Sequence, residues 1–191
     1  MSDSFSFLFS FYGLLLGLSI AELAAGFSRA WDRRVLTRVG LMGPLLALVL
    51  MLDLVSFWTN SWVMRDQLQV GYYVVLGAAT VALLYYFAAT QVFPREGAGG
   101  ALDDHVMAHR KTVIVAVILS NLLVTIGFCV VIGFSWSFLG YNFLLNAPYL
   151  LLLTAIGWLP GRRAVLGALM VTAVVSAFYE PLIAGVVALF R

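Results

Sequence analysis

The stretch TVIVAVILSNLLVTIGFCVVIGFSWSFLGYNFLLNAPYLLLLTAIGWLP, residues 112–160, contains no charged residue and no histidine. A helix crosses the hydrocarbon core of a bilayer with about 20 apolar residues. The stretch is therefore too long for one membrane-spanning helix and has the length of two. We expect the chain to reverse direction within it, at Gly133–Ser137 or at Gly140–Asn142, because Gly, Ser and Asn favour tight turns.

The composition of the whole chain agrees with this stretch. The 191 residues are 63% hydrophobic and 10% charged, with a mean hydropathy of +1.01. Soluble domains carry about 25% charged residues. The sequence therefore predicts a polytopic membrane protein whose partner is the lipid bilayer, with residues 1–191 forming a single transmembrane domain. The net charge of +2 lies in separated loop clusters, so there is no footprint of a nucleic-acid-binding surface.

Outward from the uncharged stretch, charged clusters and turn residues divide the chain into six apolar segments. The fold class we expect is all-α, a bundle of six transmembrane helices. Each segment has about the length that a spanning helix needs. The expected spans are residues 5–27, 41–63, 70–93, 112–134, 136–159 and 165–190.

The basic residues give these spans an orientation. Nine of the eleven Lys and Arg residues fall in the three loops after the first, third and fifth spans, and only Arg65 and Arg191 lie on the other side. Loops rich in Lys and Arg face the cytoplasm. We therefore expect both termini on the non-cytoplasmic side. The nine residues are Arg29, Arg33, Arg34, Arg38, Arg95, Arg110, Lys111, Arg162 and Arg163.

Three carboxylates, Glu22, Asp53 and Glu180, lie inside spans that contain no Lys, Arg or His. A charge at the bilayer centre costs about 2.5–3.5 kcal/mol on insertion scales, so such residues are usually functional. Arg29 is near enough to reach Glu22. For Asp53 and Glu180 we expect protonation, a hydrated cavity or a bound cation. Pro181 follows Glu180 and frees a backbone carbonyl beside it, as in the broken-helix sites of transporters.

Three asparagines complete the predicted ion or proton path. Asn121 is expected at about the depth of Glu22, and Asn146 near that of Asp53. Asn60 lies on the same helix face as Asp53, two turns further along the span. These polar groups together cover most of the membrane's depth.

Small residues mark the face on which the first span packs. Gly13, Gly17, Ala21 and Ala25 recur at four-residue spacing, the pattern that lets helices approach closely in lipid. The stripe joins helices within one chain or between protomers, and the sequence leaves both open. We expect a homo-oligomer or a membrane partner subunit.

The pattern of polar residues predicts a channel or transporter for protons or monovalent cations. The alternative is a non-transporting module, such as an accessory subunit, assembly factor or sensor, whose carboxylates only hold the bundle together. We expect no enzyme and no cofactor, because nucleophile, P-loop and dinucleotide motifs are missing. We expect no metal either, because His105 and His109 in a solvated loop do not make a closed site.

Two segments, FYGLLLGLSIAE at residues 11–22 and LDLVSFW at residues 52–58, resemble small bacterial inner-membrane proteins. The resemblance is one of general type over the whole chain and implies no particular activity. Usage rich in Arg, with Lys111 as the only lysine, agrees with a bacterial source. We therefore expect a multi-pass protein of the bacterial inner membrane.

Overall fold

The protein is all-helical over the residues that its computed structural model describes, which are 3–32, 40–63, 65, 70–94, 101–132 and 136–189. Within these described residues, four helices, α1 to α4, are long and apolar enough to cross a membrane. The described part contains no strand, so the predicted all-α class is confirmed. The helices are α1 (Asp3–Asp32), α2 (Met42–Val63), α3 (Tyr72–Val92), α4 (Leu102–Ile132), α5 (Trp136–Trp158) and α6 (Arg162–Leu189).

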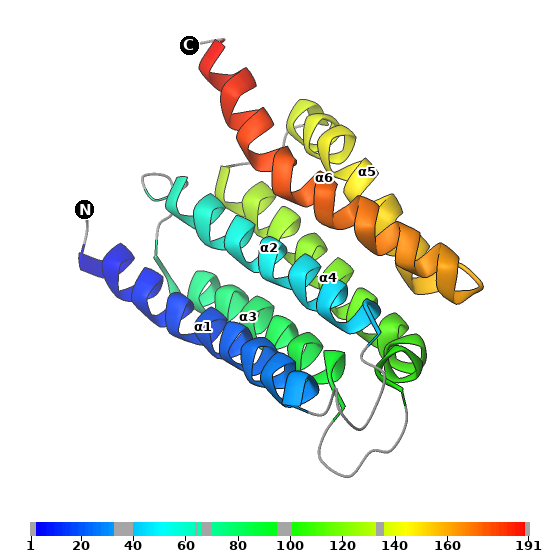
Figure 1. Cartoon of the computed structure of the whole chain (residues 1–191). Helices are drawn as coiled ribbons and strands as arrows, with labels where there is room; N and C mark the ends of the chain where they lie inside the picture. The colour runs from blue at the N-terminus through cyan, green and yellow to red at the C-terminus, as the bar shows by residue number, and fades with distance from the viewer. Residues whose placement is uncertain are drawn as a thin grey trace.

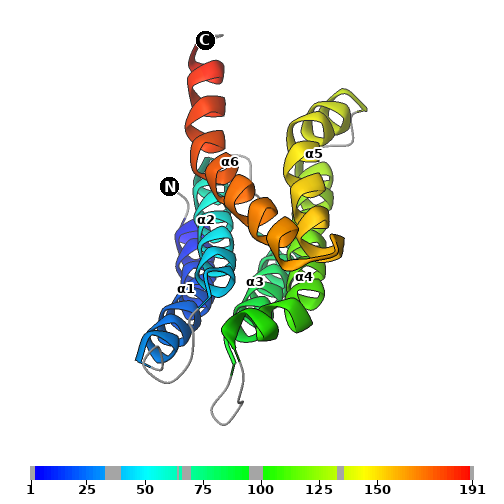
Figure 2. The ribbon, with the colours of Figure 1, turned by 45° about the vertical axis from the view of Figure 1, so that its right-hand side comes forward.

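The six helices form a bundle in which consecutive helices run in opposite directions (Figure 1). Helix α1 begins and α6 ends at the same end of the bundle, which we call the terminal end. The opposite end, where α1, α3 and α5 finish, is called the basic end. The most extensive helix contacts are those of α3 with α4 and with α1, and α2 packs against α1, α3, α4 and α6. Figure 2 shows α6 crossing the bundle obliquely, and it packs against α2 and α5.

The reversal inside the uncharged stretch falls at the first of the two predicted positions. Helix α5 begins at Trp136, so Gly140 and Asn142 lie inside a helix and a turn at Gly140–Asn142 is wrong. Helix α4 begins at Leu102, well before the expected span. It carries Asp103 and Asp104 in its first turn, where carboxylates favour the positive end of the helix dipole.

Side chains of the first turn of α4 tie several helices together at the basic end. The Met42 N–H, at the start of α2, donates to Asp103 Oδ1 at 3.2 Å. Asp104 forms an ion pair with Arg162 at the start of α6. The His105 ring contacts the Gln91 carbonyl of α3 at 3.1 Å. The turn therefore fixes the relative positions of α2, α3, α4 and α6 at this end.

The half of the bundle nearest the basic end is a closely packed apolar core. Its side chains come from five helices and are almost completely buried. We call this layer the apolar plug. It consists of Leu46, Val49, Leu50, Ala88, Val92, Val113, Ile114, Val117, Leu153, Ile156, Val165 and Leu169.

The predicted small-residue stripe of α1 is mostly on the outside of the described structure. Gly13 lies under the Trp58 ring, and a side chain added there would overlap that ring. Gly17, Ala21 and Ala25 are exposed. Gly26, which is not part of the stripe, packs more closely: an added Cβ there would lie 2.4 Å from Cδ2 of Phe93, the residue after α3. Within this chain, only Gly13 of the stripe packs closely against another helix.

Candidate functional site

Asp53 stands in the middle of α2 and is buried, with 7% of its surface exposed. The Tyr85 hydroxyl of α3 donates a hydrogen bond to Asp53 Oδ2 at 2.5 Å. The Asn121 amide of α4 lies 3.5 Å from the same oxygen and 3.4 Å from the Tyr85 hydroxyl. Three helices therefore meet at one carboxylate.

Two further phenols surround this centre. The Tyr149 hydroxyl of α5 is buried beside Asp53 and interacts with it electrostatically, outside good hydrogen-bond geometry. The Tyr12 hydroxyl of α1 interacts with both Asp53 and the Ser61 side chain. Phenol and amide groups that point at a carboxylate stabilise its ionised form through charge-assisted hydrogen bonds.

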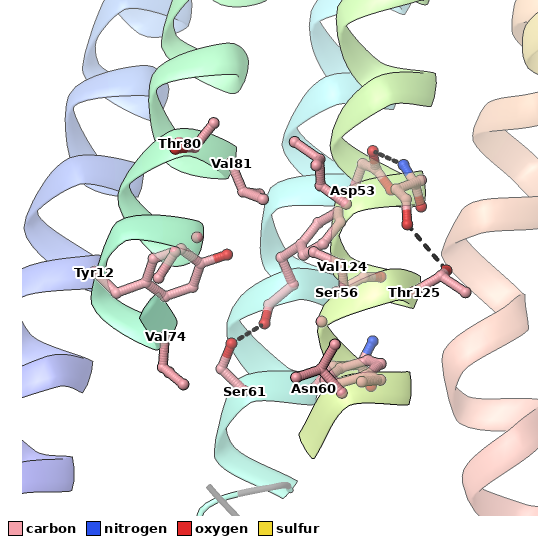
Figure 3. A pocket seen from close by; sticks show the side chains of 18 of the residues that line it. Tyr12, Asp53, Ser56, Asn60, Ser61, Val74, Thr80, Val81, Val124 and Thr125 are labelled. Carbon is pink, nitrogen blue, oxygen red and sulfur yellow. Dashed lines mark hydrogen bonds between the residues drawn. The ribbon is translucent and has the colours of Figure 1, made fainter. Parts of the chain in front are cut away.

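Asp53 opens into a cavity of about 660 Å³ to which all six helices contribute (Figure 3). The α2 residues that line the cavity run from Asp53 to Ser61, and those of α3 run from Tyr73 to Val81. Both runs lead toward the terminal end. On the other side of Asp53 the apolar plug begins. The cavity is therefore one-ended, with the carboxylate at its closed end.

The rim of the cavity extends along α3. Tyr73, Leu76, Gly77 and Thr80 line the cavity and are exposed on the surface of the bundle. They follow one another at helical spacing, so they form a single face. This part of the rim therefore belongs to a helix that is long and apolar enough to cross a membrane.

The cavity is poor in charge. Among the described residues that line it, Asp53 is the only carboxylate, and none is Lys, Arg or His. The described part of the chain also holds no group of three or more His, Cys, Asp or Glu side chains with which to bind a metal ion. A cation that entered the cavity would meet one acid and a set of neutral hydroxyl and amide groups.

The structure brings four of the predicted path residues together and sets one apart. Asp53, Asn60, Asn121 and Asn146 all line the cavity. Glu22 is not among the described residues that line it.

Glu22 instead forms an ion pair with Arg29, two turns further along α1, at 3.2 Å. Glu180 belongs to α6, but its side chain lies outside the described residues.

Sequence reasoning missed the tyrosines. Tyr12, Tyr85 and Tyr149 all lie well inside apolar segments rather than at their ends. Tyr and Trp in membrane proteins gather at the interfaces, so a Tyr near the middle of a span is itself a signal. A buried phenol needs a polar partner, and Asp53 was the nearest candidate at that depth.

These features define the class, an all-helical protein with membrane-spanning helices and a polar centre inside the bundle. Comparison of the chain with protein families, with curated proteins and with solved structures finds no match.

Proposed function

We propose that the protein is a small membrane carrier for protons or monovalent cations, with Asp53 as its central binding group. The observation that carries the proposal is the carboxylate at the closed end of a one-ended cavity. An ionisable side chain inside a membrane bundle that faces a cavity is typical of substrate and ion pathways.

The packing favours a carrier over an open channel. The cavity reaches Asp53 through the terminal half of the bundle, and the apolar plug fills the other half. On the proposed topology all six helices span the bacterial inner membrane. The basic end then faces the cytoplasm, because Lys and Arg gather there, and the cavity faces outward. A carrier alternates between two such one-ended states.

Ion flux into liposomes that contain the purified protein tests the proposal. We expect Asp53→Asn to abolish proton, Na⁺ or K⁺ flux, because the amide keeps the shape but loses the charge. Glu180→Gln tests the second predicted carboxylate in the same assay. Glu22→Gln is the matched control, since it neutralises a carboxylate that lies outside the cavity and is paired with Arg29.

The outcome that contradicts the proposal is equally definite. If wild-type protein and Asp53→Asn carry the same flux of all three cations, Asp53 is not a transport residue and the carrier proposal fails. Loss of flux in Glu22→Gln as large as in Asp53→Asn would mean that the effect is general and not tied to the cavity.

A second candidate is a non-transporting subunit in which Asp53 only joins helices. The hydrogen bonds from Tyr85 and Asn121 favour it, because they connect α2 to α3 and α4 through one side chain. The exposed Gly17, Ala21 and Ala25 would then be covered by a partner helix. Co-purification of one stoichiometric partner, together with absence of flux, would support this candidate over the carrier.

A further inference from the structure

We propose that the cavity binds an organic monocation with an apolar body, whose charged group is held by Asp53. This inference rests on the proposed function in that it takes the cavity as the substrate site. The inference goes beyond that function because a pathway for protons or metal ions alone does not need a site for an organic cation.

The size of the cavity is the first argument. A water molecule occupies about 30 Å³ in the liquid, and a bare proton or Na⁺ needs only a few such volumes around one carboxylate. Cavities of about 300–1,000 Å³ are those that hold small organic ligands. The cavity measures about 660 Å³, which is in that range.

The lining is the second argument. Most of it is apolar, and the ionisable acid lies at one end. Aromatic side chains from five helices contribute to the wall, and aromatic faces attract organic cations. An ammonium or phosphonium group at Asp53 would leave its apolar substituents against this wall. The aromatic residues are Phe9, Tyr12, Phe57, Tyr73, Phe128 and Tyr149.

The rim is the third argument. Leu76, Gly77 and Thr80 line the cavity and are also exposed along α3 at bilayer depth. A ligand with apolar substituents concentrates in the membrane because apolar groups leave water favourably. The opening along α3 therefore gives such a ligand a direct path to Asp53.

Equilibrium binding to the purified full-length protein in detergent tests the inference, with radiolabelled tetraphenylphosphonium as the probe. Tetraphenylborate has the same shape and the opposite charge. We expect saturable binding of the phosphonium, at least about thirtyfold weaker in Asp53→Asn, as expected when a buried charge loses its partner. Binding to Glu22→Gln should stay within about twofold of wild type. Tetraphenylborate should not compete.

A second variant keeps the test decisive if Asp53→Asn does not fold. Gly127 lines the cavity, and an added Cβ there would meet nothing within 4 Å. Gly127→Leu should therefore fold, narrow the cavity and weaken phosphonium binding about tenfold, the usual cost of overpacking. Unchanged binding in a folded Gly127→Leu places the ligand elsewhere and overturns the inference.

Two other results overturn it as well. One is equal phosphonium binding by wild type and a folded Asp53→Asn. The other is competition by tetraphenylborate as strong as by unlabelled phosphonium, which would mean a purely apolar site such as one for a lipid chain. The carrier proposal and the organic-cation inference are contradicted by different results. Charge-dependent binding without any flux contradicts the carrier alone, whereas Asp53-dependent proton flux without phosphonium binding contradicts the organic cation alone.

Discussion

Two acidic residues of similar chemistry, Glu22 and Asp53, have opposite environments. Glu22 shares its charge with Arg29, and both side chains are about one third exposed. Asp53 is nearly enclosed, and the described hydrogen bonds to it come from the neutral groups of Tyr85 and Asn121. A neutral donor stabilises a carboxylate without cancelling its charge. Glu22 therefore has a cationic partner on its own helix, whereas the described hydrogen-bond donors to Asp53 are neutral.

Removal of one of these donors should be measurable in stability. Tyr85→Phe leaves a buried carboxylate without its closest hydrogen bond, and we expect the protein to lose about 1–2 kcal/mol of unfolding free energy. Tyr86→Phe is the matched control, because Tyr86 is the adjacent residue and is exposed. Thermal unfolding in detergent measures both. Equal stability of the two variants would show that the short contact to Asp53 contributes nothing.

At the scale of the helix, the glycines of α1 have different tasks that their spacing does not reveal. Gly26 is buried against Phe93, the residue that follows α3, and Phe93 itself is 4% exposed. At Gly17 an added Cβ would meet nothing within 4 Å. A glycine is required at position 26 because a side chain there would collide with Phe93. At position 17 the glycine only leaves a surface position without a side chain.

Alanine substitutions at the two glycines should therefore act in opposite directions. Gly26→Ala forces Phe93 to move within a packed layer, and we expect a loss of about 1–3 kcal/mol. Gly17→Ala gains helix propensity and should be neutral or stabilising by up to about 1 kcal/mol. Denaturation in mixed micelles compares them directly. A Gly17→Ala variant less stable than Gly26→Ala would place the main packing face of α1 on the stripe.

The sequence predicts the elements well and their pairing less well. Apolar length, charged boundaries and, between α4 and α5, turn residues locate all six helices, because all three follow from the chain alone. The side-chain period places Asp53 and Asn60 on one face of α2. It does not say that this face meets Tyr85 and Asn121, because that depends on which helices become neighbours. Tyr85 has no charged neighbour in its own segment of the sequence, so its contact with Asp53 is not visible before the helices are packed.

At the scale of the whole molecule, the bundle is divided across its length. The terminal half encloses the cavity, and the other half is the apolar plug. The ties from the first turn of α4, through Asp103 and Asp104, lie at the plugged end. In the proposed carrier, the terminal half admits the ligand, and the apolar plug forms the barrier to its passage.

The proposed orientation is testable with single cysteines in a Cys129→Ser background. Gly71→Cys, at the start of α3, should react with a membrane-impermeant maleimide in intact cells, because it lies at the terminal end. Pro160→Cys, between α5 and α6, should react only after the membrane is opened. Both positions are exposed. Labelling in the opposite order would invert the topology and turn the cavity toward the cytoplasm.

The hydrogen bonds of Asp53 also have a consequence for biogenesis. Tyr85 follows Asp53 by 32 residues and Asn121 follows it by 68. At about 5–20 residues per second, Tyr85 emerges from the ribosome about 2–6 s after Asp53, and Asn121 about 3–14 s after it. During that interval α2 carries its acid without the groups that later enclose it. On the proposed topology, insertion of α2 into the membrane therefore depends on its other side chains, or α2 stays at the translocon until α3 and α4 arrive.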